Sequence, residues 1–196
     1  LWSTESRYIS DDRFTNHTGS VYDIGFNSAL QQFVSAGSDG TLIMRTIANP
    51  GVSDGISFNV SDVISVGMNQ DEGIVAFGAI DGSITLWDIE SRQQLGQPLL
   101  AHNSIVFDLA FSPNGNILAS GDDEGVIILW DVTSGQPLGE ALTGHSQGIQ
   151  ALAFNLSGDL LASGGKDNTI ILWDTETRQP VSESLTLHND RILDLT

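Results

Sequence analysis

The sequence predicts an all-β protein built from repeated four-stranded antiparallel units, and three observations lead to this prediction. A Trp-Asp pair recurs every 43 residues, with its Trp at Trp87, Trp130 and Trp173. A His follows each Trp by 15 residues, at His102, His145 and His188. No window of 11 or more residues shows a 3.6-residue apolar stripe, so essentially no helix is expected. Self-similarity at a fixed period of this length is typical of repeat folds.

One period, from His145 to Leu187, shows the four expected strands in order. The first is "GIQALAFN" at 148–155, and "DLLASGG" at 159–165 follows it. The third is "TIILWD" at 169–174, and the fourth is "QPVSESL" at 179–185. Each run is short and apolar or β-branched, and Gly, Asp, Asn, Ser or Pro separates it from the next. This pattern predicts strands joined by tight turns.

The same template divides residues 1–196 into a single segment of successive repeats. The approximate repeats are 1–14 (partial), 15–57, 58–99, 100–142, 143–185 and 186–196 (partial). Two repeats depart from the pattern. The first full repeat has Arg45 and Thr46 in place of Trp-Asp, and the second has Asn59 for the His and Phe77 for a Ser. We expect these two repeats to be the weaker part of the segment.

The recurring His, acid and Trp-Asp resemble those of the WD-repeat (WD-40) family, over all 196 positions. The outer segments "GQPLG" and "RQPVSESL" are similar to those of bacterial members. The resemblance implies a β-propeller with four full blades and a partial blade at each end. We expect the chain to be a fragment of a larger propeller with seven blades. Two alternatives are closure by self-association and a closed propeller of four or five blades.

The resemblance also implies a structural hydrogen-bond network in each blade. The acid bonds the His, the His bonds the Ser, and the Ser bonds the Trp indole, which satisfies buried polar groups. The expected members are His17, Ser35, Asp39, Asp81, Trp87, His102, Ser120, Glu124, Trp130, His145, Ser163, Asp167 and Trp173.

The same His, Ser and acid could suggest a hydrolase triad, but the repetition argues against it. An active site needs one copy, whereas this set appears in several blades. Glu124 also replaces Asp in one copy, which a hydrogen-bond acceptor tolerates better than a catalytic triad does. The segment "GVSDG" at 51–55 matches G-x-S-x-G but lacks the following helix that a nucleophile elbow requires. We therefore expect no enzyme activity in this chain.

Composition excludes several further classes of function. The chain has 25 Asp and Glu against 7 Lys and Arg, a net charge of −18, which disfavours nucleic-acid backbones. Such a surface favours a basic protein partner or serves solubility alone. No apolar run approaches the roughly 18 residues of a membrane helix. The chain has no Cys, which is compatible with the cytoplasmic location that we expect.

No cofactor and no metal site are expected either. The acidic turn "GDDEG" at 121–125 could attract calcium. Calcium prefers six to eight oxygen ligands, however, and three adjacent carboxylates in one turn supply too few. A solvated turn is the better interpretation.

By resemblance, the chain is expected to be a non-catalytic scaffold for protein–protein interaction. Partners in this family often dock on the face that carries the His loops. Candidate partner-binding residues on that face are Tyr22, Ile64, Ile105, Phe107, Gln150 and Arg191. These side chains could instead pack against neighbouring blades. The alternative function is a sensor or regulatory region of a larger multidomain signalling enzyme or NTPase.

Overall fold

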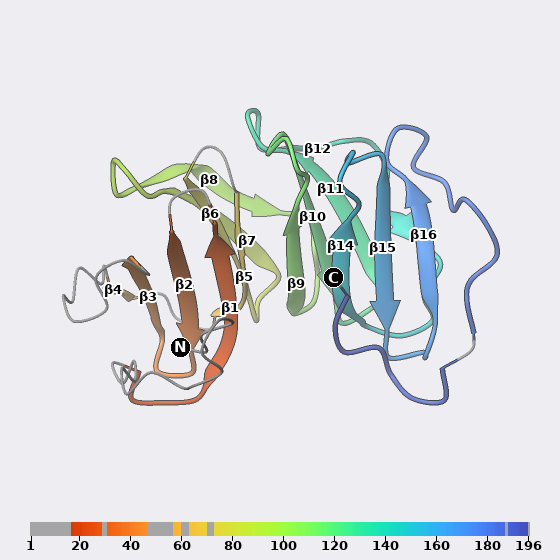
Figure 1. Ribbon diagram of the computed structural model, residues 1–196, viewed down its shortest axis with the longest axis horizontal. Coiled ribbons are helices and arrows are strands. Elements are labelled where there is room, and N and C mark those ends of the chain that lie inside the picture. Colours follow the sequence, from red (N-terminus) through yellow and green to blue (C-terminus); the bar gives the residue numbers. More distant parts are fainter. Residues whose placement is uncertain are drawn as a thin grey trace, which may run out of the picture.

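The computed structural model describes residues 17–28, 31–46, 57–59, 63–69, 73–186 and 188–195. These residues contain β-strands and no helix, as the sequence predicted. The strands form four consecutive antiparallel sheets, each built from adjacent strands in chain order (Figure 1). Each sheet is one blade, and the blades are numbered 1 to 4 along the chain.

The first two blades are regular four-stranded sheets. Blade 1 comprises β1 (Val21–Asn27), β2 (Gln32–Gly37), β3 (Thr41–Thr46) and β4 (Ser57–Asn59). Blade 2 comprises β5 (Val63–Met68), β6 (Ile74–Ala79), β7 (Ser83–Asp88) and β8 (Gln93–Leu100).

The last two blades have a divided outer strand. Blade 3 comprises β9 (Val106–Phe111), β10 (Ile117–Asp122), β11 (Val126–Asp131), β12 (Gln136–Pro137) and β13 (Leu142–Thr143). Blade 4 comprises β14 (Ile149–Phe154), β15 (Leu160–Gly165) and β16 (Ile170–Asp174). Its outer segment pairs with β16 only through single bridges from Pro180 and Leu185. The continuous outer strand expected at 179–185 is therefore interrupted.

Neighbouring blades pack face to face. Their innermost strands contact one another in succession, in the order β1, β5, β9 and β14. In blade 3, Leu118 and Trp130 pack against blade 2. The adjacent residues Ala119 and Leu129 point the other way and pack against blade 4. Because successive side chains of a strand point to opposite faces, each blade buries apolar residues on both sides. This burial is the physical reason for the repetition.

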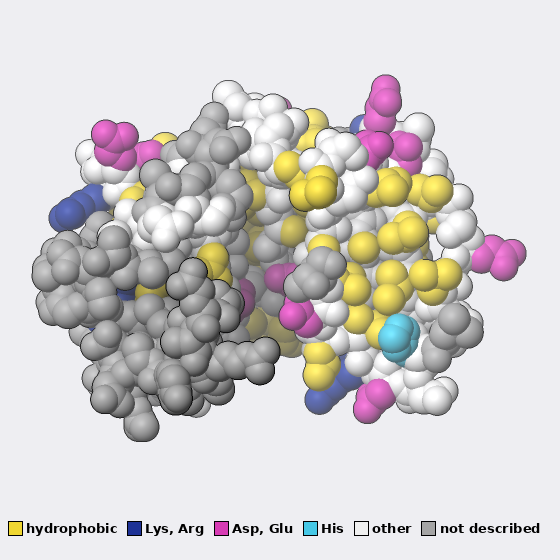
Figure 2. Space-filling model, in the orientation of Figure 1, with side chains coloured by type: hydrophobic (Ala, Val, Ile, Leu, Met, Phe, Trp, Pro, Cys, Tyr) yellow, Lys and Arg dark blue, Asp and Glu magenta, His cyan; other side chains and the backbone are white. Residues whose placement is uncertain are grey.

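The outer faces of the first and last described blades are less covered. Ile24 and Phe26 are 49% and 52% exposed, whereas their counterparts Val66 and Met68 in blade 2 are 4% and 7% exposed. Figure 2 shows hydrophobic side chains gathered over β14, β15 and β16 on the face that turns away from blade 3. These faces are of the kind that a neighbouring blade covers. The expectation of further blades stays a prediction.

Side chains on the innermost strands also link one blade to the next. Oδ2 of Asp23 accepts a hydrogen bond from the Val66 N–H at 2.7 Å, and Oδ2 of Asp108 accepts one from the Leu152 N–H at 2.6 Å. The other oxygen of each carboxyl accepts the N–H of its own next residue. One carboxyl thus serves the backbone of two blades.

These carboxyl groups occupy a repeating position, the sixth residue after the His of each blade. Along the chain this position alternates between acidic and small residues: Asp23, Ser65, Asp108, Ala151 and Asp194. Ser65 links its blade differently, because its hydroxyl donates to the Val106 carbonyl at 2.9 Å. Desolvation raises the pKa of Asp108 to about 7, although hydrogen bonds from Leu152 and Leu109 oppose the shift.

Candidate functional site

Blade 4 contains the complete hydrogen-bond network that the resemblance implied. His145 Nδ1 donates to the Asp167 carboxylate at 3.1 Å, and His145 Nε2 lies 2.8 Å from the Ser163 hydroxyl. The Trp173 indole N–H donates to the same hydroxyl at 2.8 Å. Four residues from four parts of the blade are thereby held in one chain of hydrogen bonds: the loop before β14, the strand β15, the turn after it and the strand β16.

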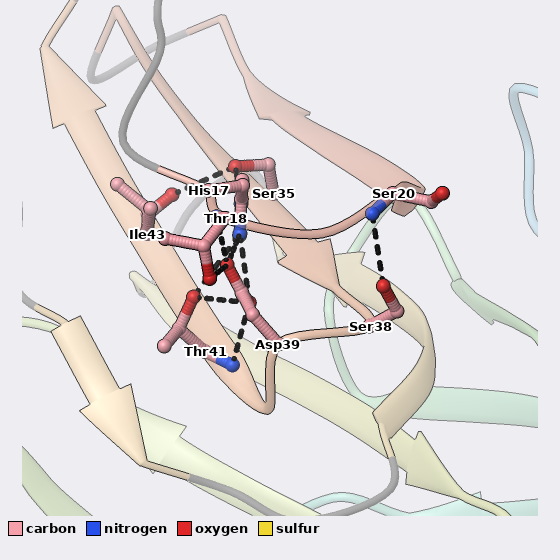
Figure 3. A network of polar contacts seen from close by, with 8 residues as sticks. All are labelled: His17, Thr18, Ser20, Ser35, Ser38, Asp39, Thr41 and Ile43. Carbon is pink, nitrogen blue, oxygen red and sulfur yellow. Dashed lines mark hydrogen bonds and ion pairs between the residues drawn. The ribbon is translucent and has the colours of Figure 1, made fainter.

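Blade 1 has the same arrangement without the Trp (Figure 3). His17 Nδ1 lies 3.1 Å from Oδ1 of Asp39, and His17 Nε2 lies 2.8 Å from the Ser35 hydroxyl. The Thr41 hydroxyl donates to Asp39 at 2.7 Å, and the Thr18 N–H donates to it at 2.6 Å. The carboxylate therefore fixes both the His loop and the turn between β2 and β3.

Blade 3 corrects the expectation for Glu124, because Asp122 is the acid that bonds His102. Oδ2 of Asp122 lies 2.8 Å from His102 Nδ1, and Oδ1 accepts the N–H groups of Glu124 and Val126. Glu124 is exposed. The rest of the network is unchanged, since Ser120 lies 2.6 Å from His102 Nε2 and accepts the Trp130 indole N–H.

The cause of this exchange is steric. Asp122 stands where blades 1 and 4 have Gly37 and Gly165. A Cβ built on Gly165 would lie 2.6 Å from His145 Nδ1 and 2.7 Å from Oδ1 of Asp167. A side chain at the glycine position therefore occupies the space of a carboxylate two residues later. The His can be bonded from either position but not from both.

In blade 2, Phe77 stands at the position of the network serine and its ring packs against Trp87. The Phe77 and Trp87 rings lie 6.5 Å apart between centroids in a tilted arrangement. Asp81 accepts hydrogen bonds from the N–H and hydroxyl of Ser83, at 2.9 and 2.6 Å. Asp81 and Trp87 were both expected to be network members; Asp81 bonds Ser83 within its own turn, and Trp87 packs against Phe77. The side chain of Asn59 lies outside the described residues.

Burial and hydrogen bonding shift the pKa values of the network residues. Burial lowers the pKa of His102, although Asp122 opposes this shift. The hydrogen bond from the Thr41 hydroxyl is the main reason that the pKa of Asp39 lies well below its usual range. Burial favours the neutral form of Asp167, but hydrogen bonds from Thr169, Ser146 and His145 outweigh it and lower the pKa.

The geometry suits a structural role rather than nucleophilic catalysis. Ser120 and Ser163 are both fully buried, so a substrate cannot reach their hydroxyl groups. Each hydroxyl already bonds a His ring and a Trp indole. A nucleophile has to be accessible to the reacting atom, and these are not.

The network holds in place the loops and turns of a surface that we name the His-loop face. It consists of the loops that enter the innermost strands and the turns between second and third strands: 17–20 with 38–40, 102–105 with 123–125, and 145–148 with 166–168. A backbone bond joins loop and turn in each of these blades, from the N–H of Ser38, Asp123 or Lys166 to the carbonyl of Ser20, Ile105 or Gly148.

Four of the candidate partner-binding residues share an irregularity of the innermost strands. The pairing of the first and second strands shifts register at the fifth residue after the His position in every blade. The residue that the shift leaves unpaired is, in chain order, Tyr22, Ile64, Phe107 and Gln150. Such β-bulges re-aim a side chain and are frequent beside functional sites.

The exposure of the candidates differs along the face. Tyr22 is 54% exposed, and Arg191 is exposed too. Ile64, Ile105, Phe107 and Gln150 are half-buried. The half-buried residues therefore keep part of their surface accessible.

Sequence reasoning missed a contact between blades 3 and 4 on this face. The Lys166 ammonium lies 4.4 Å from the centre of the Phe107 ring, and it also forms an ion pair with Asp123. Lys166 stands 43 residues after Asp123. This pairing of opposite charges at equivalent positions of adjacent repeats was the signal that could have revealed it. The contact holds the Phe107 ring in a cation–π arrangement.

Neither a metal site nor a membrane span appears in the part of the chain that the structure describes. No group of three His, Asp or Glu side chains is placed to hold a metal ion there. No helix in the same residues is long and apolar enough to cross a bilayer.

The stacked four-stranded blades define a β-propeller repeat protein. The family model described as "WD domain, G-beta repeat" matches residues 10–44, 93–131 and 135–174, more than half of the chain. The chain therefore belongs to the WD40 repeat family. It is 31% identical over 99 residues to human "WD repeat-containing protein 36". The match covers 50% of this chain and 11% of that protein, so the chain spans about a tenth of the relative's length.

Proposed function

We propose that this chain is a non-catalytic platform that binds another protein on its His-loop face. WD repeats generally mediate protein–protein interaction, and proteins of this family are typically non-enzymatic scaffolds. The single observation that supports the choice of face is the bulge repeated in all four blades. It presents a different side chain at the same place in each blade, while the strands around it stay paired.

The centre of the proposed interface is Phe107, flanked by Ile105 and Gln150. Aromatic side chains held in place before binding lose little conformational freedom on association. The ion pair between Lys166 and Asp123 fixes the ring beforehand. The net charge of −18 favours a partner with a basic surface and faster association at low salt.

The test is a comparative capture experiment in extract of the source cells. The double variant Phe107→Ala/Gln150→Ala is compared with the wild-type chain. The control is Leu156→Ala, which removes a side chain that is 98% exposed on the turn between β14 and β15. We expect a protein bound by wild type and control to be at least tenfold depleted with the double variant. Equal capture by all three proteins would refute the choice of face.

A second candidate function is a regulatory region within a larger multidomain signalling enzyme or NTPase. The observation in its favour is that the relative named above is about nine times as long as the segment it shares with this chain. Sequencing the gene on both sides of this reading frame tests it. An adjoining catalytic domain supports this function, and its absence favours the platform alone.

A further inference from the structure

An open groove separates blades 2 and 3 at the outer rim, away from the His-loop face. Its volume is about 750 Å³. One wall is the outer strand β8, and the other is the turn 132–137 of blade 3. The apolar lining residues include Leu95, Leu99, Trp130 and Val132, and Gly96 and Gly135 lie on opposite walls.

The equivalent groove between blades 3 and 4 is smaller, at about 330 Å³. Its walls are the same parts of the fold, 43 residues further along the chain. Arg178 belongs to its lining, on the turn of blade 4. The Arg178 Nε and Cζ atoms lie 3.0 and 3.2 Å from where a Cβ of Gly139 would be, so the guanidinium covers the outer strand of blade 3.

The two grooves differ at the position of this arginine. Gly135 stands in the open groove where Arg178 stands in the filled one. Gly96 corresponds to Gly139, and a Cβ built on Gly96 meets no atom within 4 Å. The open groove therefore lacks the side chain that covers the outer strand in the next blade.

The backbone at this position accepts an arginine. The φ angle is 66° at Gly135, 59° at Arg178 and 59° at Arg92, the equivalent residue of blade 2. All three adopt the same left-handed conformation. Blade 3 therefore has the same φ at this position as blades 2 and 4 but no side chain, and a Cβ built on Gly135 would lie 3.2 Å from Cδ2 of Leu99.

We propose that the groove between blades 2 and 3 binds an arginine side chain of a partner protein, in the way that Arg178 fills the groove between blades 3 and 4. The aliphatic part of the arginine packs on Leu95, Leu99 and Val132, and the guanidinium covers Gly96. The charge of −18 on this chain favours a cationic ligand. This site is independent of the proposed interface on the His-loop face.

The probe is a peptide copy of the chain's own turn, N-acetyl-TETRQPV-amide, which reproduces residues 175–181. It is titrated into the ¹⁵N-labelled 196-residue chain while the backbone amide signals of Gly96 and Gly135 are followed. The control peptide has alanine at the arginine. We expect saturable shifts of both glycine signals and at least fivefold weaker binding of the control. Shifts of equal size with both peptides, or none at these glycines, would overturn the proposal.

Two variants of the chain sharpen the test. Gly135→Arg fills the groove from within and is expected to weaken peptide binding at least tenfold. Gln97→Glu places an exposed carboxylate where the filled groove has Glu140, and is expected to strengthen binding at least threefold. If Gly135→Arg does not fold, unchanged binding to Gln97→Glu is sufficient to refute the proposal. Leu156→Ala, remote from the groove, is expected to bind like wild type.

Discussion

Oδ2 of Asp122 lies 2.8 Å from Nδ1 of His102, in the place that Asp39 and Asp167 fill from two residues further along in blades 1 and 4. The blades thus keep the hydrogen bond and change the residue that makes it. The Asp122 side chain is only 2% exposed, so the bond is shielded from water. A charged acceptor in such a position contributes more than a surface ion pair.

Asp122→Ala is therefore expected to destabilise the chain strongly, and Glu124→Ala hardly at all. Loss of the carboxylate leaves a buried His without its acceptor, which costs about 2–4 kcal/mol in the free energy of unfolding. The exposed Glu124 should change it by less than about 0.5 kcal/mol. Urea denaturation followed by Trp fluorescence measures both. A larger loss with Glu124→Ala would show that the His102 acceptor has been misassigned.

The steric exclusion between the two acid positions predicts a coupled effect in blade 4. Gly165→Asp alone should destabilise the chain, because the new side chain collides with His145 and Asp167. Adding Asp167→Glu gives "GDKE" at 164–167, which places an Asp and a Glu as in the "GDDE" of blade 3, and should restore about 1–2 kcal/mol. A double-mutant cycle in urea measures the coupling. Purely additive effects would contradict the exclusion.

His145→Ala is expected to lower the thermal midpoint, since it removes the partner of Asp167 and Ser163. The expected loss is about 1–3 kcal/mol in the free energy of unfolding. His188→Ala is the matched control, because His188 is exposed at the equivalent position of the following repeat. Differential scanning calorimetry compares the two variants. Identical midpoints for both would mean that the network does not stabilise blade 4.

Burial of His102 predicts a loss of stability at mildly acidic pH. Its pKa is lower in the folded chain than the ordinary 6.5, so below about pH 6.5 the unfolded chain binds a proton that the folded chain does not. Stability from this group is present at neutral pH and falls as the pH drops towards the folded pKa. An NMR titration of the His102 ring checks the direction. A midpoint above 6.5 would reverse the prediction.

Asp108 predicts the opposite pH dependence. Its pKa is raised to about 7, so the folded chain holds the proton more tightly between about pH 4 and 7, and its stability contribution falls as the pH rises through this range. Asp108→Asn removes the titration. Relative to wild type, the variant should gain about 1–3 kcal/mol between pH 5 and pH 8. A difference that does not change with pH would show that Asp108 ionises normally.

The sequence predicted the strands well because spacing and turn residues are local properties. The repeated Trp-Asp marked the third strand of blades 2, 3 and 4, and the His marked the loop of blades 1, 3 and 4. The structure brings His17, Ser35 and Asp39 together from three separate segments. The outer strands cross the approximate repeat boundaries, since β8 extends to Leu100 and β13 to Thr143.

The sequence-based prediction was wrong where more than one residue could satisfy the same spacing pattern. Counting 22 residues from His102 leads to Glu124, but the counting cannot show that Asp122 already fills the space. Contacts between blades were missed for a related reason. The pairing of Phe107 with Lys166 and of Asp108 with Leu152 depends on how adjacent sheets are stacked, which no single period specifies.

The alternation of Asp23, Ser65, Asp108, Ala151 and Asp194 has a consequence for how such a chain can change in length. Asp23 and Asp108 each hold the backbone of their own blade and of the next one. A deletion or duplication of one period would place two acids, or two small residues, side by side. A change by two periods would preserve the alternation. The alternation is therefore kept only when the number of blades changes by whole pairs.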